Sequence, residues 1–368
     1  MTGDTSRPKI IVTGGLGYVG SHCALQLVKQ GYSVIIIDNL QNSCAQVYNR
    51  LITMLKLPPK NDMLNVFEID MLDLQALKVV FDDSVPVTAV IHLAGLKSVG
   101  ESVLDPVKYY KNNLVSTINL LECMDEFKVD KLIFSSSATV YGLPEHLPIT
   151  ESHRIGQNLT NTYGQTKFMI EQMLQDLVKS QQIRISQLNQ IVKNDMTPIS
   201  VTILRYFNPV GSDTSGLIGE CPIGTPANLM PYVCQVAAGQ RPVVNVYGNN
   251  YDTPDGTGIR DYVHVTDLAL GHVAALKYMS PSPCIEVYNL GTGKGYSVLE
   301  MITAMEKASG RKIPITIKER RDGDIASCYC DPSKAEKCLN WKATRTLDDM
   351  CKDLWNWQLL NPQGYATA

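Results

Sequence analysis

The stretch Ile10-Ile-Val-Thr13, followed directly by Gly14-Gly-Leu-Gly17-Tyr-Val-Gly20, decides the fold. Its apolar residues predict a buried strand, and the G-x-x-G-x-x-G spacing opens into a stretch that we expect to be a helix over 21–30. Glycines at such a turn let the backbone approach a pyrophosphate, whose charge then lies against free N–H groups at the start of the helix. The same spacing also suits an ordinary glycine-rich turn, so its surroundings have to decide.

A second strand, expected over Ser33–Asp38, ends in a carboxylate. This carboxylate follows the glycines at an offset of ~20 residues, at which a carboxylate binds the adenosine ribose hydroxyls of a dinucleotide. This carboxylate would repel the 2′-phosphate of NADP, and Asn39 and Leu40 offer no compensating arginine, so NAD is favoured. Asp70 closes another strand and could accept from the adenine amino group, although a simple strand-end turn explains it equally well.

Short apolar runs alternate with longer amphipathic stretches over the first 140 residues, which is typical of βαβ units. They predict an α/β fold with a Rossmann-type doubly wound parallel sheet, whose ligands bind at the carboxyl edge of the strands. From Arg205 on, Pro- and Gly-rich loops become frequent. We therefore divide the chain into an NAD-binding domain over 1–204 and a smaller C-terminal substrate-binding α/β domain over 205–368, with 253–265 and 288–295 as segments that return to the first domain. The expected strands are 9–13, 33–38, 65–70, 89–94, 131–135 and 200–204.

Composition excludes several classes of partner. The 368 residues include 33 basic and 36 acidic side chains, a net charge of −3, so no bulk basic field exists for nucleic acid or anionic lipid. The apolar runs are shorter than the ~20 residues of a membrane span, and the N-terminus lacks the apolar core of a secretory signal. We expect a cytoplasmic protein. Its 10 cysteines form neither a Cys-x-x-Cys pair nor a cluster with histidine, which predicts reduced thiols and no metal site.

Two further signals indicate proton transfer: Ser135-Ser-Ser-Ala-Thr-Val-Tyr141 at a strand end, and Tyr163-Gly-Gln-Thr-Lys167 at the start of a helix. The tyrosine and lysine, four apart, share one helix face. Ionising a tyrosine near neutral pH means lowering a pKa of ~10 by about 3 units, or roughly 4 kcal/mol. An ammonium ~5 Å away supplies about 3 kcal/mol at an effective dielectric of ~20, and an oxidised nicotinamide could supply the rest. A serine of the first cluster would bridge the proton. Tyr141 has Glu145 instead of lysine at the fourth position, so we expect it to pack near the site.

This combination resembles the extended short-chain dehydrogenase/reductases, and among them the UDP-galactose 4-epimerase (also UDP-glucose 4-epimerase) family. The similarity covers nearly the whole chain and includes runs that are far more specific than the glycines. These runs are His92-Leu-Ala-Gly-Leu-Lys97-Ser-Val-Gly-Glu-Ser102, Tyr109-Tyr-Lys-Asn112-Asn113, Arg205-Tyr-Phe-Asn208-Pro-Val-Gly211, Asn228-Leu-Met-Pro231, Asp255-Gly-Thr-Gly-Ile-Arg260-Asp-Tyr-Val-His264 and Arg320-Arg-Asp-Gly-Asp324.

The resemblance implies a role for each matching residue. Arg260 and Arg321 would clamp the two phosphates of UDP, Asp324 would hold the uridine ribose and Tyr247 would pack on the uracil. The implied catalytic residues are Ser137, Tyr163 and Lys167. The implied NAD-binding residues are Gly14, Gly17, Tyr18, Gly20, Asp38, Asn39, Asp70, Met71, Leu93, Ala94, Lys97, Asn112, Tyr163, Lys167 and Tyr206. The implied UDP-sugar-binding residues are Lys97, Ser137, Asn208, Asn228, Leu229, Tyr247, Arg260, Arg321, Asp324 and Cys328.

The implied reaction is the reversible 4-epimerisation of UDP-galactose and UDP-glucose through a transient 4-keto sugar and bound NAD. Tyr163 would take the proton of the 4-hydroxyl, and the sugar would turn over about its link to an anchored UDP before hydride returns. Cys328 resembles a size gate beside the 2-substituent of the sugar. A cysteine leaves space there, so we hypothesise that UDP-GlcNAc and UDP-GalNAc are also interconverted; a buried thiol without bearing on specificity is the alternative. The family also implies a homodimer.

Three other functions have to be weighed against the same residues. A nucleotide-sugar 4,6-dehydratase would need an extra acid beside the catalytic serine, but Ala138 follows Ser137. A UDP-glucuronate 4-epimerase is not excluded by any residue. A non-catalytic NAD-binding scaffold is disfavoured because Tyr163 and Lys167 are both present. Two departures from the family pattern are Thr162, where proline is expected, and a longer connection over 181–195, which we interpret as a surface elaboration.

Overall fold

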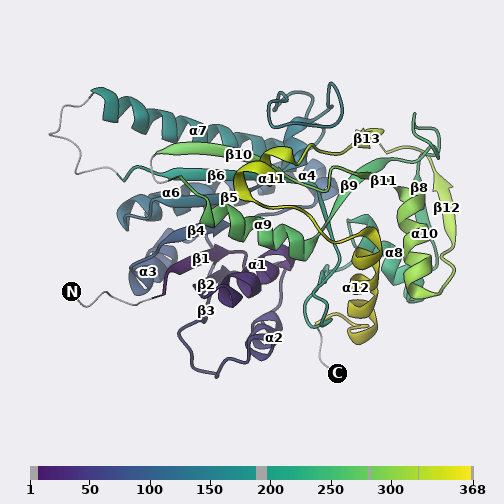
Figure 1. Cartoon of the computed structure of the whole chain (residues 1–368), viewed down its shortest axis with the longest axis horizontal. Coiled ribbons are helices and arrows are strands. Elements are labelled where there is room, and N and C mark those ends of the chain that lie inside the picture. Colours follow the sequence, from purple (N-terminus) through teal and green to yellow (C-terminus); the bar gives the residue numbers. More distant parts are fainter. Residues whose placement is uncertain (1–6, 188–196, 281–282, 322, 366–368) are drawn as a thin grey trace.

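The computed structural model describes residues 7–187, 197–280, 283–321 and 323–365. Its largest sheet has seven strands in the order β10-β6-β5-β4-β1-β2-β3, which runs from top to bottom in Figure 1. All neighbours in this sheet are parallel, so the predicted Rossmann-type fold is confirmed. The strands are Lys9–Thr13 (β1), Ser33–Asp38 (β2), Leu64–Glu68 (β3), Ala89–His92 (β4), Lys131–Ser137 (β5), Ser200–Tyr206 (β6) and Cys284–Leu290 (β10).

Helices cover both faces of this sheet because successive side chains of its strands point to opposite faces. Ile10 and Val12 belong to one buried core and Ile11 to the other, each with 0% exposure. The core of Ile11 includes side chains from Leu74–Ser84 (α3), Ser116–Glu126 (α6) and Thr162–Gln187 (α7). The other includes side chains from Tyr18–Lys29 (α1), Gln46–Leu55 (α2) and Val265–Lys277 (α9).

Shorter helical turns follow two of the strands and lead into α6 and α7. After β4 come Val99–Leu104 (α4), Pro106–Tyr110 (α5) and the π turn Lys111–Val115 (η1), and after β5 comes the 3-10 turn Ala138–Tyr141 (η2). The helix after the glycine turn begins at Tyr18, earlier than expected, because Gly20 lies inside its first turn.

The later part of the chain builds a second, smaller assembly on the right of Figure 1. Its strands are Asn208–Val210 (β7), Val244–Tyr247 (β8), Ile259–His264 (β9), Gly295–Ser297 (β11), Ile315–Lys318 (β12) and Ser327–Cys328 (β13); its helices are Leu229–Ala237 (α8), Val298–Ser309 (α10) and Leu347–Leu360 (α12). Ser333–Leu339 (α11) packs instead against β10 of the large sheet and against α9. β9 pairs with β7, β11 and β13, and β8 pairs with β12. Of the two segments expected to return, 288–295 includes the end of β10 in the large sheet, whereas 253–265 includes β9 in the small one. The division at residue 204 stays a prediction.

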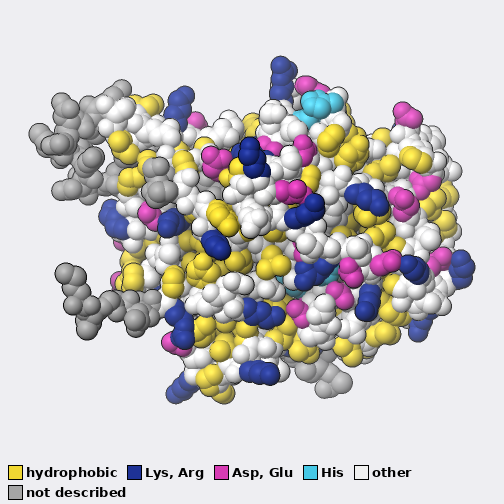
Figure 2. Space-filling model, viewed as in Figure 1, with side chains coloured by type: hydrophobic (Ala, Val, Ile, Leu, Met, Phe, Trp, Pro, Cys, Tyr) yellow, Lys and Arg dark blue, Asp and Glu magenta, His cyan; other side chains and the backbone are white. Residues whose placement is uncertain are grey.

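Several expectations concern the surface and the thiols. α7 continues to Gln187, and residues 188–196, which include most of the predicted elaboration, lie outside the described residues. No described helix combines the length and the apolar character that crossing a bilayer requires. All 10 cysteines are free thiols. Figure 2 shows basic and acidic side chains interspersed on the face it displays.

Candidate active site

A cavity of about 1370 Å³ lies at the carboxyl edge of the large sheet, between it and the smaller assembly. Both parts of the chain contribute to its wall, and every predicted binding or catalytic residue lines it. These residues are Gly14, Gly17, Tyr18, Gly20, Asp38, Asn39, Asp70, Met71, Leu93, Ala94, Lys97, Asn112, Ser137, Tyr163, Lys167, Tyr206, Asn208, Asn228, Leu229, Tyr247, Arg260, Arg321, Asp324 and Cys328.

The glycine turn has no room for side chains. A Cβ on Gly20 would lie 2.1 Å from the carbonyl oxygen of Gly14, and Gly14 itself has a φ of +65° with the backbone of Ala94 2.9 Å from its would-be Cβ. The Gly17 amide closes the turn by donating to the Gly14 carbonyl at 3.1 Å. The backbone therefore faces the cavity directly at the start of α1, which is the arrangement that a dinucleotide pyrophosphate requires.

Two carboxylates lie where the sequence predicts the adenosine end of a dinucleotide. Asp38 ends β2 with 8% exposure, accepts from the Leu16 amide at 2.9 Å and accepts from the Ser43 hydroxyl at 2.6 Å. It thus fixes the glycine turn as well as lining the cavity. Asp70 accepts from the Asn39 side chain at 3.1 Å. Carboxylate acceptors at this end fit the ribose hydroxyls and the adenine amino group of NAD.

The three expected catalytic side chains meet at the end of β5. Ser137 is its last residue, while Tyr163 and Lys167 lie one turn apart at the start of α7. The Lys167 ammonium donates to the Ser135 carbonyl at 2.7 Å and lies 4.8 Å from the Phe134 ring centroid. It also lies 5.9 Å from the ring centroid of Tyr163. Only 5% of Lys167 is exposed. Its side chain therefore places a buried cation beside the phenol ring of Tyr163 in the cavity wall.

The electrostatics differ from the expectation. Burial raises the pKa of Tyr163 to about 12, and the hydrogen bond with Ser137 opposes this shift. Burial also lowers the pKa of Lys167 to about 8, against the raising effect of Glu171. Burial thus places the pKa of Tyr163 above the ordinary ~10 from which the expected lowering begins, so the chain by itself does not lower it and the phenol needs a further cation. The chain alone keeps this phenol neutral at about pH 7.

A buried ion pair holds α7 against the sheet behind the catalytic residues. Glu171, one turn after Lys167, has 0% side-chain exposure and binds Arg205 of β6 at 2.6 Å. It also accepts from the Ser136 hydroxyl at 2.5 Å. Arg205 donates to the Tyr141 hydroxyl at 3.1 Å, so Tyr141 packs beside the site as expected. This network connects the strand of Ser137 to the helix of Tyr163.

The arginines expected for the diphosphate share one carboxylate on the far side of the cavity. Arg321 donates to Asp324 at 2.8 Å, and Arg260 lies 3.8 Å from the other oxygen of the same side chain. The Arg321 guanidinium stacks over the Tyr247 ring, 4.9 Å from its centroid. Cys328 lies in β13, in register with Arg260 of β9. Two planar guanidinium groups at one place suit the oxygens of a diphosphate.

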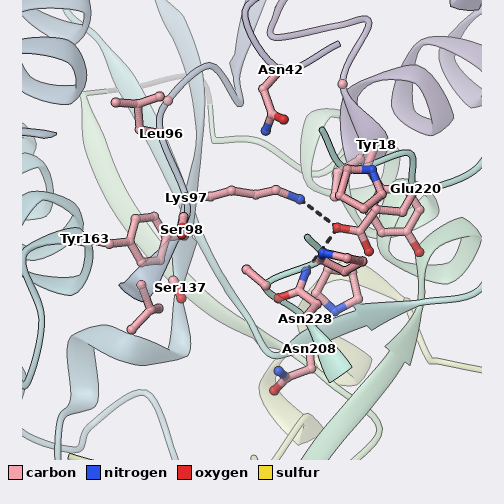
Figure 3. A pocket seen from close by; sticks show the side chains of 18 of the residues that line it. Tyr18, Asn42, Leu96, Lys97, Ser98, Ser137, Tyr163, Asn208, Glu220 and Asn228 are labelled. Carbon is pink, nitrogen blue, oxygen red and sulfur yellow. Dashed lines mark hydrogen bonds and ion pairs between the residues drawn. The ribbon is translucent and has the colours of Figure 1, made fainter. Parts of the chain in front are cut away.

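Glu220 and Tyr365 are among the residues of the cavity wall that sequence reasoning missed. The Glu220 carboxylate contacts Lys97 and Asn228, as Figure 3 shows. No spacing rule marks either residue. The one available signal for Glu220 is its position eight residues before Asn228, in a loop rich in glycine and proline.

Comparisons with known proteins agree on one group of enzymes. The profile of a family described as GDP-mannose 4,6 dehydratase matches residues 11–354. The UDP-glucose 4-epimerase of Bacillus subtilis (strain 168) is 50% identical over 359 residues, which cover 98% of this chain and 99% of that protein. The UDP-glucose 4-epimerase of Homo sapiens is 50% identical over 362 residues, with coverages of 98% and 99%. The crystal structure of UDP-glucose 4-epimerase from Bifidobacterium longum in complex with NAD+ and UDP is 48% identical, covers 97% of this chain and 99% of that chain, and superposes with a TM-score of 0.87.

Proposed function

Because this chain belongs to the UDP-glucose 4-epimerases of the extended short-chain dehydrogenase/reductase family, we infer that it catalyses the reversible 4-epimerisation of UDP-galactose and UDP-glucose with NAD as its cofactor. The main support for this function is that the glycine turn, the Tyr163–Lys167 pair and the Arg260–Arg321 pair all line one cavity. The dehydratase in the family description is disfavoured, because Ala138 stands where a dehydratase needs an extra acid.

In the proposed mechanism, Tyr163 removes the proton of the 4-hydroxyl and returns it after inversion. NAD, held by the glycine turn and Asp38, would supply the hydride acceptor and a positive charge in the cavity. Ser137 bridges the proton between sugar and phenol, and Lys167 stabilises the phenolate from the side of α7. Since burial keeps the pKa of Tyr163 at about 12, the phenol becomes a base only when cationic charge on both sides favours its ionised form.

The other side of the cavity anchors the nucleotide. Arg260 and Arg321 bind the diphosphate, Asp324 binds the uridine ribose, and Tyr247 packs on the uracil. With UDP fixed there, the hexose in its 4-keto form turns about the link to the diphosphate, so that hydride returns to the opposite face. Asn208, Asn228 and Leu229 complete the UDP site; these three line the cavity where β7 begins and where α8 begins.

We extend the substrate range to UDP-GlcNAc and UDP-GalNAc on the basis of Cys328. This residue lines the cavity beside Arg260, and its small side chain leaves space for an N-acetyl group. Burial raises the pKa of the Cys328 thiol to about 11, so it is neutral at about pH 7 and acts through its size.

We propose that the protein works as a homodimer in the cytoplasm. Leu104 of α4 and Val107 of α5 are 87% and 74% exposed, and exposed apolar side chains on adjacent turns are typical of an interface. The 10 free thiols suit a reducing compartment. Light scattering after gel filtration should give twice the 40.7 kDa of one chain.

The decisive experiment incubates the purified protein with UDP-galactose, without added cofactor or reductant, and separates the products by anion-exchange chromatography. UDP-glucose should form, and denaturing the protein should release NAD. Tyr163→Phe should abolish the reaction, whereas Tyr278→Phe, at a surface tyrosine with 45% exposure, should not. A 4-keto-6-deoxy product would instead indicate a dehydratase, and an NAD-loaded protein that forms no UDP-glucose would refute the proposed function.

A further inference from the structure

Glu220 is an acidic side chain of the cavity that none of the proposed roles uses. It lies in the loop between β7 and α8, and only 8% of its side chain is exposed. The ligands of this cavity carry two diphosphates, one in NAD and one in the UDP-sugar, and a carboxylate repels both. We therefore expect Glu220 to make other interactions that favour ligand binding by more than this repulsion opposes it.

The contacts of Glu220 connect the two sides of the cavity. Its Oε1 atom accepts from Lys97 Nζ and from Asn228 Nδ2, both at 3.0 Å. Figure 3 shows Lys97 extending across the cavity to reach this carboxylate, with Asn228 approaching from below. Lys97 follows β4 of the large sheet, whereas Asn228 precedes α8 of the smaller assembly. One oxygen atom thus holds Lys97, which is expected to bind both NAD and the UDP-sugar, and Asn228, which is proposed for UDP.

Asn228 has an unusual set of contacts for its position. It is the N-cap residue of α8, where asparagine usually accepts from an N–H of its own helix, but its side chain makes no capping bond. The amide donates to Glu220 instead. A side-chain amide carries two N–H protons, so the bond to Glu220 uses one of them and leaves the second able to donate to another acceptor.

The loop of Glu220 is held from behind by the C-terminal part of the chain. The Tyr365 hydroxyl donates to the carbonyl of Gly219 and accepts from its amide, both at 3.0 Å. The Trp357 indole donates to the carbonyl of Glu220 at 3.2 Å. These bonds fix the backbone next to the carboxylate, so its position does not depend on the ligands.

We propose that Glu220 is a positioning residue that orients Lys97 toward NAD and Asn228 toward the diphosphate of the UDP-sugar. The inference rests on the proposed function and goes beyond it, because one side chain then links retention of NAD to affinity for substrate. Among the described residues, the Glu220 carboxylate bonds to Lys97 and Asn228 and to neither Tyr163 nor Lys167. Its loss should therefore weaken binding and leave the chemical step nearly unchanged.

The test compares Glu220→Ala and Glu220→Gln in the full chain. The alanine variant should raise the KM for UDP-galactose about tenfold, since a charge-assisted hydrogen bond is lost, while kcat changes less than about threefold. It should also retain less NAD after gel filtration. The glutamine variant still accepts from Asn228, so its KM should return to within about threefold of the parent. Its NAD content should stay low, because a neutral amide does not attract the Lys97 ammonium.

A matched control is Glu126→Gln, which removes the charge from another lysine–glutamate pair, 2.6 Å between Lys78 and Glu126, outside the cavity wall. Its KM, kcat and NAD content should equal those of the parent. In an Asn228→Ala background, Glu220→Ala should raise KM no further, because the effect on UDP passes through Asn228.

Several results would overturn the proposal. An unchanged or lower KM in both Glu220 variants would mean that the carboxylate only repels phosphate, and a fall in kcat at constant KM would place its effect in the chemistry. If the alanine variant does not fold, the NAD content of Glu220→Gln decides, and a content equal to that of the parent would overturn the proposal. UDP affinity by calorimetry and NAD content need no turnover. A parent protein that binds both but forms no UDP-glucose would therefore refute the proposed function and leave this inference standing.

Discussion

Replacing Lys167 by methionine tests the electrostatic basis of the proposed mechanism. Methionine keeps the length of the side chain and removes its charge. At the 5.9 Å between Lys167 Nζ and the ring centroid of Tyr163, an ammonium stabilises a phenolate by about 3 kcal/mol at an effective dielectric of about 20. This equals about 2 pKa units, so the variant should hold roughly 100-fold less phenolate at a given pH and lose about the same factor in kcat.

The assay measures kcat for UDP-galactose from about pH 6 to about pH 10, on protein whose NAD content has been determined. Because burial already raises the pKa of Tyr163 to about 12, kcat of Lys167→Met should climb steadily with pH as more phenol ionises. Lys179→Met, at an exposed position of the same helix, should behave like the parent. A loss of less than about fivefold at full NAD occupancy, or a pH profile that matches the parent, would refute the electrostatic argument.

Unfolding does not provide a competing explanation for this loss. The pKa of Lys167 falls from 10.5 to about 8 on burial, so between these values the unfolded chain binds more protons, and stability rises with pH through this window. Below about pH 8 the buried ammonium costs up to about 3 kcal/mol. Lys167→Met should therefore melt no lower than the parent at about pH 7, and its stability should lack this rise with pH.

Three further predictions concern specificity, folding and the glycine turn. Cys328→Tyr should lower turnover of UDP-GalNAc at least about tenfold relative to UDP-galactose; an unchanged ratio would refute the size gate. Glu171→Ala should lower the free energy of unfolding in urea by about 3–5 kcal/mol, because it leaves Arg205 buried and unpaired, whereas Glu171→Leu with Arg205→Met should recover most of this loss. Gly20→Ala should abolish NAD retention, since its Cβ would lie 2.1 Å from a backbone oxygen; at Gly100 an added Cβ meets no atom within 4 Å, and its alanine variant should retain NAD.

The sequence predicts those parts of the site that depend on local geometry. The glycine turn, Asp38 at the end of a strand and the spacing from Tyr163 to Lys167 each follow from one element and its period, so the strand and helix patterns place them correctly. The sheet itself is predictable for the same reason. Its boundaries are less so: β5 and β6 continue to Ser137 and Tyr206, because pairing between neighbouring strands extends them.

What the sequence does not predict depends on contacts between distant segments. β9 stays in the smaller sheet because its partners β7, β11 and β13 are there, and no local pattern in 253–265 identifies those partners. Glu220 acquires its contacts from Lys97 and Asn228, which come from different parts of the chain. The raised pKa of Tyr163 likewise comes from burial, and burial of one side chain cannot be predicted from the spacing of residues along a helix.

The raised pKa of Tyr163 has a consequence for how the reaction is controlled. With Lys167 already beside it, a phenol with a pKa of about 12 is almost entirely protonated at about pH 7. The remaining stabilisation has to come from the cation that a nicotinamide in its oxidised form brings to the cavity. The base is therefore active when the cofactor can accept hydride and becomes protonated once that charge is lost. Proton and hydride then leave the sugar together and return to it together. The retention of NAD, to which Lys97 contributes, therefore also controls the protonation of Tyr163.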